Sequence, residues 1–154
     1  DEAHYNLGCT YAQLGERQQA LQHYLEAVRI NPKNVFAINN LASLYRTSGR
    51  TAEAIAEYTK ALRINPDDAI VHNNLGVTYL MENRVELAEE CFAAALKIDP
   101  EFAEPEAQLG AIAVRRGDIK GAEEHFERAL KYKPQLEFAR ISLEQLRKSR
   151  SRSR

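Results

Sequence analysis

The sequence lacks several features that identify particular classes of protein. No stretch approaches the roughly 18 consecutive apolar residues that a membrane-spanning helix requires, so we expect no membrane insertion. Only two cysteines are present, Cys9 and Cys91, and the pattern described below places them on different helices, two repeats apart. A disulfide between them is therefore not expected. We expect reduced thiols and a cytoplasmic location.

The sequence also has little net charge. It contains 22 acidic and 21 basic residues, for a formal net charge of −1. Five of the basic residues lie within 147–154, which leaves 16 basic against 22 acidic groups in residues 1–146. Because a nucleic-acid-binding surface carries an excess of basic side chains, no nucleic-acid partner is expected.

Motifs of catalytic and metal sites are absent as well. The sequence contains no phosphate-binding glycine-rich loop, no HExxH zinc motif and no nucleophile elbow. Four histidines fall at only two positions of the repeat described below: His4, His23, His72 and His125. Substitution within a repeat explains this distribution, and equivalent positions on adjacent repeats are too far apart to share one metal ion. We predict no catalytic residue, no metal and no cofactor in this chain.

What the sequence has instead is a 34-residue repeat, present in four blocks: 1–34, 35–68, 69–102 and 103–136. The seventh position is leucine in every block, and the eighth is glycine or alanine. Alanine occupies the twentieth and twenty-seventh positions, tyrosine or phenylalanine the twenty-fourth, and proline the thirty-second. Because stacked repeats present an extended surface rather than an enclosed pocket, the period favours binding over catalysis.

Each block has the pattern of two helices. In the second block, Ile38, Leu41, Ala42 and Tyr45 recur at i, i+3, i+4 and i+7, which is one face of a helix. This helix should end at Gly49, because glycine just after a helix readily adopts the left-handed conformation. The other blocks hold Gly15, Asn83 and Gly117 at this position. The second helix should end before the proline, so each block forms a helical hairpin whose small residues allow close packing.

The C-terminal part departs from the repeat. Residues 137–148 begin a fifth block, with Leu143 at the leucine position but Glu144 at the small one. We expect this segment to form a helix that caps the last hairpin with a polar outer face. Residues 149–154 alternate serine and arginine, and are expected to be disordered. The chain begins at Asp1 rather than methionine, and we expect it to be an excerpt of a longer protein.

These positions resemble the tetratricopeptide repeat (TPR) family. The family pattern has a large residue at position 4, Leu at 7, Gly or Ala at 8, Tyr at 11, Ala at 20 and 27, an aromatic at 24 and Pro at 32. The resemblance covers residues 1–136 and is weakest in the fourth block, where Ala113 stands at the tyrosine position. It implies an all-α fold, a right-handed superhelical solenoid of four hairpins plus the capping helix. It also implies a protein-interaction role, with the first helix of each hairpin on the concave side.

TPR proteins hold ligands through positions 2, 5, 6, 9, 12 and 13 of the first helices. Position 6 is a carboxamide in every block: Asn6, Asn40, Asn74 and Gln108. A carboxamide can pair with both the N–H and the C=O of one peptide unit. Helices about 10 Å apart would meet an extended chain at about every third residue. The column resembles the asparagine ladder of O-linked N-acetylglucosamine transferases, and we predict an extended peptide or protein segment as the ligand.

Further side chains flank this column and are expected to contact the same peptide: Tyr5, Phe36, Asn39, Asn73, Arg46 and Arg115. The two aromatic residues offer apolar contact, and the two arginines can meet acidic side chains. The alternative interpretation of each is an ordinary solvated surface residue.

The carboxylate clamp of TPR co-chaperones fits this sequence less well. That arrangement places cations where this chain has Tyr5, Ile70 and Asn74. Without those cations a C-terminal carboxylate would lose its charge-assisted hydrogen bonds, so we do not expect this mode.

Three functions remain open. The first is a protein-interaction module or scaffold that binds an extended peptide in its concave groove. The second is the substrate-recognition region of a larger enzyme, such as a glycosyltransferase, with a catalytic domain outside residues 1–154. The third is a structural array that self-associates through its uncapped N-terminal face. We expect a monomer or weak self-association.

Overall fold

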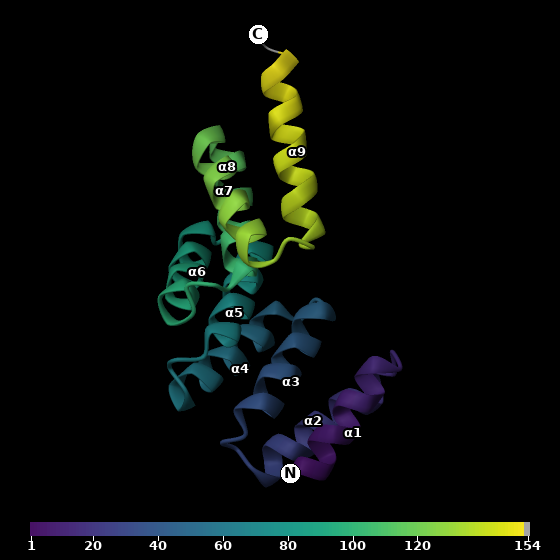
Figure 1. Cartoon of the computed structure of the whole chain (residues 1–154). Helices are drawn as coiled ribbons and strands as arrows, with labels where there is room; N and C mark the ends of the chain where they lie inside the picture. Colours follow the sequence, from purple (N-terminus) through teal and green to yellow (C-terminus); the bar gives the residue numbers. More distant parts are fainter. Residues whose placement is uncertain (153–154) are drawn as a thin grey trace.

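The computed structural model describes residues 1–152, which form nine α-helices. In chain order they are α1 Glu2–Gln13, α2 Arg17–Ile30, α3 Val35–Thr47, α4 Thr51–Ile64, α5 Ala69–Met81, α6 Val85–Ile98, α7 Ala103–Arg116, α8 Ile119–Tyr132 and α9 Glu137–Arg152. Helices α1 to α8 pair into antiparallel hairpins that stack from the N-terminal to the C-terminal end, with α9 packed after the last hairpin (Figure 1). The predicted all-α solenoid of hairpins is confirmed.

The turn inside each hairpin depends on one residue with positive φ. Gly15, Gly49 and Gly117 have φ of 78°, 76° and 77°, and Asn83 has φ of 56°. These are the four positions predicted to stop the first helix. The left-handed region is accessible to glycine and asparagine, whereas most other side chains would be strained there.

The core of each hairpin is an aromatic ring packed on a small residue. A Cβ atom added to Gly8 would lie 2.6 Å from the ring of Tyr24, and one added to Gly76 would lie 2.7 Å from the ring of Phe92. Tyr24 is 3% exposed and Phe92 is fully buried. The small position therefore makes room for a ring, in addition to letting the two helices approach.

Contacts between hairpins place the first helices on one side of the array. Helix α3 contacts α5, and α5 contacts α7, whereas each second helix contacts the first helix of the next hairpin. The first helices thus line a common inner face, as the TPR resemblance implied. None of the helices in residues 1–152 has the length and apolar character needed to cross a bilayer.

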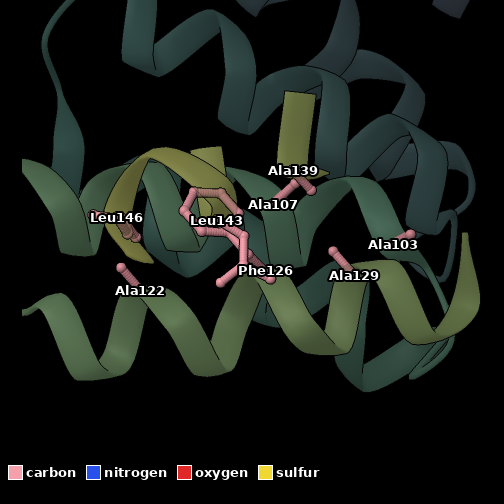
Figure 2. Close-up of a cluster of buried hydrophobic side chains, with 8 residues drawn as sticks. All are labelled: Ala103, Ala107, Ala122, Phe126, Ala129, Ala139, Leu143 and Leu146. Atoms are coloured by element: carbon pink, nitrogen blue, oxygen red, sulfur yellow. The ribbon is translucent and has the colours of Figure 1, made fainter. Parts of the chain in front are cut away.

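Helix α9 covers the C-terminal end of the array. Its residues Ala139, Leu143 and Leu146 are 0%, 6% and 9% exposed. They pack with Phe126 and Ala122 of α8, and alanines of α7 complete the cluster (Figure 2). The helix thus contributes the same leucine position as the hairpins do, and buries it in the same way.

The predicted disorder of the Ser/Arg tail is wrong for residues 149–152, because α9 continues to Arg152. Residues 153–154 lie outside the described part of the chain. Arg147 donates to Glu127 of α8 at 2.6 Å, and Arg150 donates to Glu123 at 3.2 Å. Composition alone predicted disorder because these acidic partners lie in a different helix, 20 and 27 residues earlier in the sequence.

Candidate functional site

The inner face of the first two hairpins contains an open cleft of about 470 Å³ between α1 and α3. Its walls include residues at positions 6, 9 and 13 of the repeat: Cys9, Gln13, Asn40, Ser43 and Thr47. Ala12, Leu44 and the edge of Tyr24 add apolar surface. Among the predicted site residues, Asn40 lines this cleft, and the others lie outside its lining.

A hydrogen-bonded group at Cys9 joins the first two hairpins. The sulfur of Cys9 accepts from the Tyr24 hydroxyl at 3.6 Å and from Nδ2 of Asn40 at 3.5 Å. Burial raises the pKa of Tyr24, and the contact with Cys9 raises it further. The phenol therefore keeps its proton at neutral pH and remains a donor. Burial raises the pKa of Tyr5 as well, again with a contribution from Cys9.

Three asparagines continue this group from α3 to α5. Nδ2 of Asn39 donates to Oδ1 of Asn40 at 3.3 Å, and Nδ2 of Asn74 donates to Oδ1 of Asn39 at 3.0 Å. Asn39 belongs to position 5 and the other two to position 6. A carboxamide offers two N–H donors and two lone pairs, so each of the three retains at least one donor and one lone pair for a ligand.

The other carboxamides at these positions stand apart from this row. Asn6 is exposed on α1, Gln108 is partly buried on α7, and within residues 1–152 neither joins the hydrogen-bonded group. Oδ1 of Asn73 is buried without a hydrogen-bond partner in the described chain. The four position-6 residues thus form no continuous ladder, because Asn39 links only Asn40 and Asn74.

The two predicted arginines lie in different surroundings. Arg115 is exposed on α7, whereas Arg46 is partly buried on α3, with its Nε shielded from solvent. Arg46 stands at the position that Ala12 holds in the first hairpin, where the cleft lies. Burial raises the pKa of Tyr58, and the nearby Arg46 charge and Ser43 hydroxyl lower it in part. Arg46 therefore lies beside the buried Tyr58 hydroxyl. The charged side chain that lines the first cleft is Arg17, at the start of α2.

Exposed apolar side chains on the same face were largely missed by the sequence analysis. Phe36 is 71% exposed and Ile70 is 59% exposed, and both occupy position 2. Phe138 of α9 holds the same position and is 48% exposed. The signal was available, because position 2 is apolar in two successive first helices, α3 and α5, and again in α9, whereas α7 has Glu104 there. Tyr5 lies near this row, with its ring centroid 6.5 Å from that of Phe36.

In the first and fourth hairpins the structure brings together repeat positions 4 and 23, which the sequence does not link. Nδ1 of His4 lies 2.9 Å from Nδ1 of His23, and the ring of Tyr11 stacks on His23. In the fourth hairpin the same positions hold Glu106 and His125, 2.7 Å apart. Positions 4 and 23 thus face each other within a hairpin. Among the described residues, no three His, Cys, Asp or Glu side chains converge as metal ligands would.

Comparison with known families accounts for this architecture. Models of the tetratricopeptide repeat match residues 1–34 and 69–102, residues 23–56, and residues 107–136. A further model, described as a TPR repeat, matches residues 42–83. The chain belongs to the tetratricopeptide repeat family. A search of curated proteins gives no match to this TPR array.

Solved structures share all or most of the stack of hairpins. PilF from Pseudomonas aeruginosa has a TM-score of 0.88 and 27% identity, covering 97% of this chain and 69% of that chain. MamA has a TM-score of 0.79 and 20% identity, covering 97% and 82%. The first TPR domain of Spaghetti (RPAP3), bound to the HSP90 peptide SRMEEVD, has a TM-score of 0.69 and 20% identity, covering 76% and 93%.

The TPR fold sets the general function of the chain. TPR arrays bind proteins or peptides, and this chain is a protein-interaction module in that sense. Its inner face combines a cleft, a row of carboxamides and exposed apolar residues at position 2.

Proposed function

We propose that the concave face of this TPR array binds an extended peptide segment of a partner protein. Asn40 and Asn74 hold the peptide backbone, with Asn39 between them. The observation that carries the proposal is the hydrogen-bonded row itself, which crosses from α3 to α5 beside the open cleft. The row fixes the orientation of the three side chains, so less conformational entropy is lost when a ligand binds.

The chemistry of the row favours recognition of backbone rather than of particular side chains. Each carboxamide can still donate one N–H and accept one hydrogen bond, which matches the two polar groups of a peptide unit. A net hydrogen bond contributes about 0.5–1.5 kcal/mol, and association itself costs at least about 4 kcal/mol. Three carboxamides alone therefore bind weakly, and further contacts must supply affinity.

Those further contacts come from the neighbouring side chains. Phe36 and Ile70 supply exposed apolar surface beside the row, and Tyr5 lies next to Phe36. Arg46 and Arg115 pair with acidic side chains of the ligand. Asn6, Asn73 and Gln108 extend polar contact towards the two ends of the groove. The ligand that fits is an extended segment with alternating apolar and polar side chains, since successive side chains of such a segment point to opposite sides.

The peptide-bound TPR domain of Spaghetti supports peptide binding by an array of this fold. The clamp positions for a terminal carboxylate hold Tyr5, Ile70 and Asn74 in this chain, none of which is a cation. An internal segment of the partner is therefore the proposed ligand.

The test begins with selection of binding peptides from a random peptide library displayed against the intact chain. Affinities of the selected peptides are then measured by calorimetry for the double variant Asn40→Ala, Asn74→Ala. We expect a loss of at least about tenfold, because two backbone-directed hydrogen bonds disappear. Asn65→Ala, an exposed asparagine at the end of α4, is the matched control. Unchanged affinity in the double variant, with its helical content intact, would show that the row does not bind the peptide.

A further inference from the structure

The cleft between α1 and α3 differs in charge from the rest of the array. Arg17, at the start of α2, lines this cleft, and within residues 1–152 no acidic side chain does. Residues 1–146 as a whole carry 16 basic and 22 acidic groups. A hollow with a cation and no carboxylate therefore has the opposite sign to the chain around it, and its charge favours a negatively charged ligand group.

The uncharged polar groups of the cleft add hydrogen-bond donors. Ser43 and Gln13 both line it, and a hydroxyl and an amide can each donate. Asn40 gives one N–H of Nδ2 to the Cys9 sulfur, and its Oδ1 accepts from Asn39. The second N–H of Asn40 is left for a ligand. An ionised carboxylate accepts hydrogen bonds and donates none, so it matches this set of donors.

A second cation lies next to one wall of the cleft. Burial raises the pKa of the Tyr58 hydroxyl, and both Arg46 and Ser43 lower it in part, which places these three groups together. Nε of Arg46 is shielded from solvent and has no hydrogen-bond partner in the described chain. Within residues 1–152 no carboxylate pairs with Arg46 or with Arg17. A partly buried cation without an anionic partner is costly, and an anion in the cleft would offset that cost.

The cleft has room for a ligand side chain because Ala12 is small. Ala12 lines the cleft at position 12 of the repeat, where the second hairpin has Arg46 and the third has Leu80. Alanine is the shortest of the three side chains and leaves the most space beside the neighbouring first helix. The resulting hollow measures about 470 Å³ and opens to solvent.

We propose that this cleft takes an anionic side chain of the bound peptide, with Arg17 as its ion-pair partner and with Ser43 and Gln13 as donors. The inference rests on the proposed function, because a peptide backbone held by Asn40 brings a side chain to the cleft. It adds a chemical requirement, namely an acidic residue at one fixed place in the ligand. Its cation stands at position 17, on a second helix, so the site is separate from the clamp positions for a terminal carboxylate.

The first experiment uses the peptides selected on the intact chain. Their aligned sequences should share an aspartate or glutamate at one place. Calorimetry should show about tenfold weaker binding when that residue is replaced by its amide, and about three- to tenfold weaker binding of the acidic peptide to Arg17→Gln. The Arg17→Gln chain should also distinguish the acidic peptide from its amide less well. Arg63→Gln, at an exposed arginine near the end of α4, is the matched control and should change nothing.

Charge reversal separates an ion pair from a general loss of binding. Arg17→Glu should bind the acidic peptide worst, and should recover binding of a peptide with lysine at the same place. The affinity of the unmodified chain should fall with added salt more steeply than that of Arg17→Gln. Phosphoserine in place of the acidic residue distinguishes two sources of negative charge: tighter binding than glutamate indicates phosphate, and weaker binding indicates carboxylate.

The double variant Asn40→Ala, Asn74→Ala distinguishes failure of this proposal from failure of the proposed function. If the double variant lost affinity while Arg17→Gln behaved like Arg63→Gln, the peptide would bind in the groove and the anion site would be refuted. Unchanged affinity in all of these variants would refute both proposals. Selected peptides with no shared acidic residue would also overturn the anion site.

Discussion

The two ends of this array have leucine at the same repeat position, but the leucine is buried at one end and exposed at the other. At the C-terminal end, Leu143 occupies position 7 and is 6% exposed under the last hairpin. At the N-terminal end, Leu7 occupies the same position and is 45% exposed. Helix α9 carries Glu144 at the usually small position 8, with an ion pair to Lys148 at 2.6 Å. One end is thus closed by a helix with a charged outer side, and the other is left apolar.

The difference separates two kinds of contact. Contacts inside a hairpin are alike at both ends: Gly8 lies against Tyr24 as Gly110 lies against Phe126. Contacts between hairpins depend on a neighbour, so they are complete at α9 and missing at α1. In an array where each unit touches only the next, the stability of an end unit depends on the interface it has. The first hairpin should therefore open more readily than the last.

The largest expected effect comes from truncating leucine at position 7. Leu143→Ala should lower the free energy of unfolding by about 2–5 kcal/mol, because it leaves a cavity in the cluster of Figure 2. Leu7→Ala should cost less than about 1 kcal/mol, since this side chain is already half in water. Urea denaturation followed by circular dichroism measures both. Equal losses for the two variants would mean that the ends are not different.

An intermediate effect is expected at position 8, where the ends should behave alike. Gly110→Ala places a methyl group 2.8 Å from the ring of Phe126, and Gly8→Ala does the same against Tyr24. The gain in helix propensity offsets part of the strain, and we expect a net loss of about 1–2 kcal/mol for each. Ala42→Gly in the second hairpin is the reverse change. It should cost more than about 1 kcal/mol, because it lowers the helix propensity and also removes a buried methyl group. If Gly8→Ala left the free energy of unfolding unchanged while Gly110→Ala lowered it, the two ends would also differ inside their hairpins.

The smallest effect concerns positions 4 and 23, where the first hairpin has a histidine pair and the fourth has Glu106 with His125. Burial by itself raises the pKa of Glu106, but the His125 hydrogen bond and the Arg128 charge outweigh it, and the pKa lies below the ordinary 4.5. A lowered folded pKa means that the carboxylate stabilises the fold above pH 4.5 and that this contribution disappears as the pH falls through the folded pKa.

Glu106→Gln is the variant that isolates this contribution. At pH 7 it should reduce the free energy of unfolding by about 1 kcal/mol. The difference from the unmodified chain should shrink below pH 4.5, where the native carboxyl takes up its proton. Denaturation series at several pH values measure it. A difference that stays constant from pH 7 down to strongly acidic conditions would indicate lost packing rather than lost charge.

Much of the fold could be predicted from the sequence, because the determining contacts are local. Gly49 and Asn83 stop their helices where glycine or asparagine was expected, and positions 8 and 24 meet within one hairpin. The C-terminal end of α9 could not be predicted from local contacts. Arg150 pairs with Glu123, a residue 27 positions earlier, and composition does not reveal such a partner.

The candidate site was predictable only as a set of positions. The repeat identified the face on which Asn40 and Asn74 lie, but not that Asn39 would bridge them or that Asn6 would stand apart. Hydrogen bonds between side chains depend on rotamers and on neighbours from two helices at once, which a column of identical residues does not specify. Of the exposed apolar residues at position 2, Phe36 was predicted to contact a ligand, whereas Ile70 and Phe138 were not.

The restriction of helix contacts to neighbouring hairpins also has a mechanical consequence. The main helix contacts in the described chain join helices of the same hairpin or of neighbouring hairpins. Tension applied between the two termini would therefore unfold the hairpins one after another rather than all at once. Within residues 1–152 the first hairpin contacts one neighbouring hairpin, whereas the second and third contact two, so the first would unfold before them.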